Sequence, residues 1–109
     1  MYSKELGIIG TGKIGSALLK RLISTNTIDK NNIIAYDIDD NKRNKLSEEF
    51  NVEYAESNAE LAKTSKYIII AVIPQVIDTV LKEIGPIITN EQVIISIAAG
   101  VSFKTVSIT

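Results

Sequence analysis

Short runs of β-branched residues alternate along this chain with longer segments whose apolar positions recur every three or four residues. Continuous apolar runs are typical of strands buried on both faces, and the three-four spacing is typical of amphipathic helices. The pattern predicts strands at 6–9, 33–37, 52–54, 67–72 and 93–97, with 67–72 as the central, fully buried one. It predicts helices at about 13–25, 41–50 and 77–84, and a short helix from residue 57.

Strands that alternate with helices in this order form a parallel sheet that is covered by helices on both faces. We therefore expect an α/β fold: a Rossmann-type, doubly wound parallel sheet in three layers. A chain of 109 residues, 45% of them apolar, is long enough for one core and too short for two ordinary domains. The whole chain, 1–109, is predicted to be a single domain.

Two predicted helices carry start signals. Asp39 or Asp40 is placed to cap the helix at 41–50. Ser57 and Glu60 have the spacing of a capping box, in which each side chain accepts a hydrogen bond from a free backbone donor at the helix start.

A glycine motif, G-x-G-x-x-G, lies between the first predicted strand and the first predicted helix. In a dinucleotide-binding fold Gly10 would permit a tight turn, Gly12 would let a pyrophosphate approach the backbone, and Gly15 would let the helix pack on the strand. The free N–H groups at the helix start would face the phosphates. The alternative is a plain turn between a strand and a helix. The candidate residues are Gly10, Thr11, Gly12, Lys13, Ile14 and Gly15.

Asp37 ends the second predicted strand, 22 residues beyond Gly15 (37 less 15), near the ~20-residue interval expected for a ribose-binding carboxylate. Together with the glycine motif it favours dinucleotide binding over a plain turn. The carboxylate would repel a 2′-phosphate, which favours NAD over NADP. Lys42 and Arg43 lie close enough in sequence to offset that repulsion, so the sequence leaves NAD or NADP open.

A second phosphate motif competes with this interpretation. Gly7, Gly12 and Lys13 match the first seven positions of G-x-x-x-x-G-K-[ST], which would predict Mg-ATP binding. Ile14 has no hydroxyl for the Mg²⁺ ion, and Gly7 falls within the first predicted strand, so we consider this hypothesis the weaker one.

Composition narrows the chemistry further. A net charge of -1 provides no basic field for nucleic acid or an anionic membrane, and no apolar run approaches the ~18 residues of a membrane span. The chain has neither Cys nor His, which removes disulfides, thiolate and imidazole metal ligands, and the usual general base. We expect no metal site, no nucleic acid or membrane partner, and a cytoplasmic location.

Three sequence blocks together resemble one family, the N-terminal domain of pyrroline-5-carboxylate reductase, the enzyme of the last step of proline synthesis. The blocks are 7–15 (GIIGTGKIG), 71–75 (AVIPQ) and 96–102 (SIAAGVS). The cofactor domains of deazaflavin-dependent NADP reductases look similar, so such an enzyme stays an alternative.

The resemblance implies an oxidoreductase domain that binds NADP or NAD, in an enzyme that passes hydride to a cyclic imine. It implies that 71–74 lies against the nicotinamide and its ribose, that 98–100 frames the nicotinamide, and that residue 58 is near the adenosine. These residues are Asn58, Ala71, Val72, Ile73, Pro74, Ala98, Ala99 and Gly100.

The helical domain that relatives use for dimerisation and for substrate binding is expected to be absent from these 109 residues. We therefore name no catalytic residue. The alternative to an enzyme domain is a nucleotide-binding module without chemistry of its own, and self-association stays open.

Overall fold

The computed structural model describes residues 2–97 and 104–106, which form a six-stranded sheet in the order β3-β2-β1-β4-β5-β6. The strands are β1 (Lys4–Ile9), β2 (Ile33–Tyr36), β3 (Glu53–Tyr54), β4 (Ser65–Ile70), β5 (Val93–Ser96) and β6 (Lys104–Val106). The helices are α1 (Lys13–Ser24), α2 (Asp40–Phe50), α3 (Asn58–Thr64) and α4 (Pro74–Ile84), with a single 3₁₀ turn, η1 (Lys30–Asn32).

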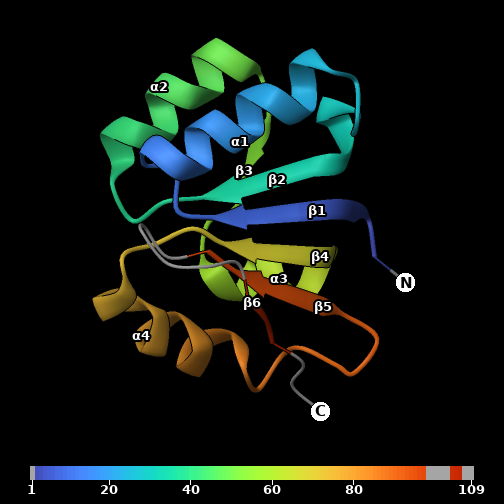
Figure 1. Cartoon of the computed structure of the whole chain (residues 1–109), viewed down its shortest axis with the longest axis vertical. Coiled ribbons are helices and arrows are strands. Elements are labelled where there is room, and N and C mark those ends of the chain that lie inside the picture. The colour runs from blue at the N-terminus through green and yellow to red at the C-terminus, as the bar shows by residue number, and fades with distance from the viewer. Residues whose placement is uncertain (1, 98–103, 107–109) are drawn as a thin grey trace.

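Strands β1 to β5 run parallel, which confirms the predicted doubly wound α/β sheet. The strand order reverses between β1 and β4, so the loops that follow these two strands diverge to opposite faces of the sheet (Figure 1). Strand β6 pairs antiparallel with β5, and the sequence pattern did not predict it. Its three residues are too few for an alternating pattern to emerge.

Each face of the sheet has its own apolar cluster. Helices α1 and α2 cover one face, where Leu19 of α1 packs against Ile8 and Ile33 of the sheet (Figure 1). Helices α3 and α4 cover the other face, where Leu61 and Ile84 pack against the sheet. The three predicted layers are thus present.

The predicted central strand is displaced and less buried than expected. Strand β4 begins at Ser65 and ends at Ile70, whereas the apolar run suggested 67–72. Tyr67 is 40% exposed, so the prediction of burial on both faces is wrong at this residue. The reason is that α1 and α2 pack over the β1–β2 half of their face and leave part of β4 uncovered.

The predicted helix starts are present, with one difference. Asp39 caps α2, its carboxylate accepting a hydrogen bond from the backbone N–H of Asn41 at 2.9 Å. The Ser57 hydroxyl accepts from the N–H of Glu60 at 3.1 Å, as the capping box requires. The Glu60 carboxylate accepts from the N–H of Glu56 at 3.3 Å, one residue before the position expected for a capping box.

Candidate functional site

The loops that follow β1, β2 and β4 meet at the carboxyl edge of the sheet (Figure 1). The backbone ladder continues into them: the N–H of Gly10 donates to the carbonyl of Tyr36 at 2.8 Å, and that of Ala71 donates to the carbonyl of Ile9 at 2.7 Å. Ligands of open parallel sheets bind at this edge, where the strand order reverses. These hydrogen bonds therefore hold a candidate ligand surface in one arrangement.

The three glycines of the motif meet different surroundings. Gly10 has a φ of +95°, and a Cβ there would lie 2.6 Å from the carbonyl oxygen of Ala71. A Cβ at Gly15 would overlap the carbonyl oxygen of Gly10, so α1 packs against the loop with no room for a side chain. A Cβ at Gly12 would meet nothing within 4 Å. The motif thus combines two packing glycines with one that borders open space.

Helix α1 begins at this open space without a protein cap. Gly12 is the N-cap residue and supplies no side-chain hydrogen bond, and the first turn contains no acidic residue. The first N–H groups of a helix have no partner within the helix, and they carry its partial positive charge. Lys13 is exposed beside them. This helix start has the donors and the charge that a phosphate group requires.

Asp37 follows β2 and is 8% exposed. Its Oδ2 accepts hydrogen bonds from the backbone N–H of Thr11 at 2.7 Å and from the Thr11 hydroxyl at 2.9 Å. Its Oδ1 accepts from the N–H of Asp39 at 2.9 Å. The carboxylate that the sequence singled out for a ribose therefore also ties the glycine loop to the start of α2.

The hydroxyl of Tyr54 in β3 is buried beside this network and has no hydrogen-bond partner among the residues that the structure describes. Burial raises the pKa of the phenol to about 12, and the neighbouring Asp37 charge adds to the rise. The phenol therefore stays neutral at the back of the glycine loop.

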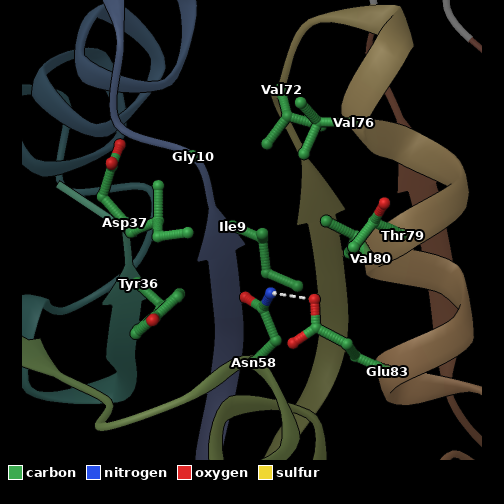
Figure 2. Close-up of a pocket in the computed structure, with 11 residues that line it drawn as sticks. Ile9, Gly10, Tyr36, Asp37, Asn58, Val72, Val76, Thr79, Val80 and Glu83 are labelled. Carbon is green, nitrogen blue, oxygen red and sulfur yellow. Dashed lines mark hydrogen bonds between the residues drawn. The ribbon is translucent and has the colours of Figure 1, made fainter.

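A pocket of about 130 Å³ opens beside this loop, with Ile9 and Gly10 of the β1 end on one side and α4 on the other (Figure 2). Asn58, at the start of α3, is 7% exposed. Its Nδ2 donates to Oε1 of Glu83 at 3.5 Å, and its Oδ1 is buried without a partner in the described part of the chain. The pocket therefore contains one hydrogen-bond acceptor, Oδ1 of Asn58, that a ligand could use, and most of its other walls are apolar. Its lining residues are Ile9, Gly10, Tyr36, Asp37, Ile38, Asn58, Val72, Val76, Thr79, Val80 and Glu83.

Sequence reasoning missed the contribution of α4 to this pocket. Val76, Thr79, Val80 and Glu83 line it, at positions i, i+3, i+4 and i+7 of the helix (Figure 2). The signal was present, because this spacing places two polar residues on a helix face that also carries apolar ones.

The other predicted site residues are distributed around the pocket. Val72 lines it, Ile73 is 58% exposed at the N-cap of α4, and Pro74 is the first residue of that helix. Ile14 in α1 is 39% exposed at the same edge, as is suitable for contact with a ligand. The predictions for residues 98–100 lie outside the described residues.

Three further expectations can be compared with the structure. Gly7 lies within β1, where a Cβ would overlap the Ser65 hydroxyl, so it is a packing glycine of the sheet and not part of a phosphate loop. Across residues 2–97 and 104–106 no cluster of three acidic side chains is placed to hold a metal ion. No helix in this part of the chain has the length and apolarity to cross a membrane.

Comparison with known proteins gives a consistent set of relatives. The family model for coenzyme F420-dependent NADP oxidoreductases matches residues 5–100. The chain is 35% identical to pyrroline-5-carboxylate reductase of Methanosarcina acetivorans over 96% of its own length and 39% of the relative's. It is 36% identical to that of Synechocystis sp., over 95% and 39%. It thus spans about two fifths of the length of these curated relatives.

Comparison with solved structures also finds pyrroline-5-carboxylate reductases. The pyrroline-5-carboxylate reductase of Coxiella burnetii superimposes with a TM-score of 0.80 at 26% identity, covering 92% of this chain and 37% of that one. The Plasmodium falciparum pyrroline carboxylate reductase, solved with NADP bound, gives a TM-score of 0.71 at 31% identity, covering 90% and 34%.

Proposed function

This chain belongs to the family of coenzyme F420-dependent NADP oxidoreductases, and from that premise we propose that it is the NADP- or NAD-binding domain of a reductase. The observation that carries the proposal is the uncapped start of α1 at Gly12, which borders open space. It lies next to a pocket in which Oδ1 of Asn58 has no hydrogen-bond partner among the described residues. The phosphates of a dinucleotide would bind at the start of α1, and its adenosine would enter the pocket.

Each part of the site has one task in this proposal. The first N–H groups of α1 and Lys13 bind the pyrophosphate, and Gly12 leaves room for it. The apolar walls of the pocket hold the adenosine, while Asp37 and Asn58 accept its hydrogen bonds. A volume of about 130 Å³ suits one ring system and not the whole dinucleotide. The 71–74 loop and 98–100 are left for the nicotinamide end.

We further propose that the parent enzyme reduces pyrroline-5-carboxylate to proline. The names of the curated relatives support this substrate. A bound dihydronicotinamide supplies the hydride, and the residues of this chain position it and exclude water from one side. We assign no proton donor, and we propose that the parent enzyme is cytoplasmic.

The second candidate is a dinucleotide-binding module without catalysis of its own. It is favoured by the lack of a His or Cys that could move a proton at the site. Turnover separates the two candidates: reduction of pyrroline-5-carboxylate by purified 1–109 with NADH or NADPH would exclude the module.

Calorimetric titration with NADH, NADPH and Mg-ATP tests the proposed function. We expect saturable binding of at least one dinucleotide and none of Mg-ATP. Gly12→Val should abolish binding while leaving the fold intact, because its side chain would enter the space next to α1 that the phosphates need. Ser24→Val, at the opposite exposed end of α1, is the control and should bind like the wild type. Failure of both dinucleotides to bind would refute the proposal.

A further inference from the structure

The side-chain amide of Asn58 has two possible orientations, which differ in the exchange of its oxygen and its nitrogen. Asn58 is 93% buried (100 less the 7% exposed), and its Nδ2 lies 3.5 Å from Oε1 of Glu83 in α4. A carboxylate can only accept hydrogen bonds, and of the two amide atoms only the nitrogen can donate one. Glu83 therefore holds Nδ2 toward itself and Oδ1 away from itself (Figure 2).

This orientation leaves Oδ1 of Asn58 to be satisfied by a ligand. The oxygen is buried and has no hydrogen-bond partner among the described residues. A buried acceptor without a donor costs free energy, so a ligand group that supplies the donor gains affinity. Asn58 and Glu83 both line the pocket, and neither Lys nor Arg is among its lining residues. The ligand group that enters this part of the pocket must therefore carry a hydrogen-bond donor.

The two ends of the pocket face different parts of the proposed ligand. Asp37 and Gly10 lie at the end next to the start of α1 (Figure 2). Asn58 and Glu83 lie at the other end, and Ile9 lies between the two ends. If the ribose binds at Asp37, the purine ring covers Ile9. The amino group of adenine is on the six-membered ring, remote from the ribose, so it would meet Asn58.

We propose that Glu83 is a positioning residue that makes this domain selective for adenine over a 6-oxo purine such as hypoxanthine. The inference rests on the proposed function, and it adds the identity of the base. The amino group of adenine donates a hydrogen bond to Oδ1 of Asn58, which Glu83 holds in place. The oxo group of hypoxanthine instead places a second acceptor against Oδ1, so that neither oxygen has a donor.

The test compares the calorimetric affinities of the full chain for NADH and for reduced nicotinamide hypoxanthine dinucleotide. The two ligands carry the same charge and differ only in the purine. We expect the wild type to bind NADH about tenfold more tightly. Glu83→Gln keeps the shape of the side chain, but its amide can present either an oxygen or a nitrogen to Asn58. The Asn58 amide can then turn over, and the preference for NADH should fall below about threefold.

Asp78→Asn is the matched control. It removes a carboxylate from the same helix, but Asp78 is exposed and does not line the pocket, so the preference should stay at the wild-type value. A variant that only loosened the fold would weaken the binding of both dinucleotides and leave their ratio unchanged. Equal binding of the two dinucleotides by the wild type, or an undiminished preference in Glu83→Gln, would overturn this inference and leave the proposed function standing. Binding of neither dinucleotide would overturn both.

Discussion

At the scale of single residues, the Asp37 carboxylate connects the glycine loop to the start of α2 through three hydrogen bonds. Its position after a strand, at the expected interval from the glycine motif, indicated its place at the carboxyl edge. Its bonds to Thr11 and to the N–H of Asp39 could not be predicted, because they depend on how three loops approach one another. Oδ1 of Asn58 likewise has no partner among the described residues, which depends on how α3 packs against α4 and could not be predicted from the sequence.

Tyr54 gives a prediction for alkaline pH. Its pKa is raised from 10.0 to about 12, first by burial and further by the Asp37 charge. Between these two values the folded protein keeps a proton that the unfolded chain has released. The free energy of unfolding should therefore fall as pH rises above about 10, with no contribution below that pH.

Denaturant unfolding at about pH 9 and about pH 11 measures this effect. Tyr54→Phe should remove the part of the alkaline loss that comes from this phenol, and it should make the two curves more alike. Tyr67→Phe, at a ring that is 40% exposed, is the control. An unchanged pH dependence in Tyr54→Phe would contradict the assignment.

At the scale of elements, the contact between α1 and the glycine loop depends on Gly15. A methyl group at this position would overlap the carbonyl oxygen of Gly10 and force the helix away. We expect Gly15→Ala to lower the free energy of unfolding by about 1–3 kcal/mol, with the better helix propensity of Ala offsetting part of the cost.

Equilibrium denaturation measures this loss, with Lys20→Ala as the control variant. Lys20 is on the exposed side of α1, so the free energy of unfolding of this control should stay within about 0.5 kcal/mol of the wild type. If Gly15→Ala were as stable as the control, the close packing between helix and loop would not be needed.

Most elements could be predicted because apolar periodicity reports directly on burial. Within the residues that the structure describes, the pattern located five of the six strands and all four α-helices, to within a few residues at their ends. It failed where burial depends on neighbours: the run at 67–72 looked fully buried, yet α1 leaves Tyr67 exposed. It also failed for β6, a three-residue strand whose pairing with β5 is a tertiary contact.

At the scale of the whole molecule, a dinucleotide that bridges the loops after β1, β2 and β4 should stabilise the entire domain. At a free concentration of 100 times Kd, binding should add about 2.7 kcal/mol to the free energy of unfolding. For a domain of this size the Tm should rise by roughly 10 °C. Thermal denaturation with and without NADH measures the shift, and Gly12→Val should show none. A shift of equal size in that variant would place the ligand elsewhere.

The two edges of the sheet have a consequence for association between molecules. The edge strands are short, with two residues in β3 and three in β6. On β3, Glu53 adds a charge that pairs with Nζ of Lys4 at 3.3 Å. Short, charged edges offer few unpaired backbone groups to a strand from another molecule. The fold therefore protects its long apolar strands from edge-to-edge aggregation by placing them in the interior of the sheet.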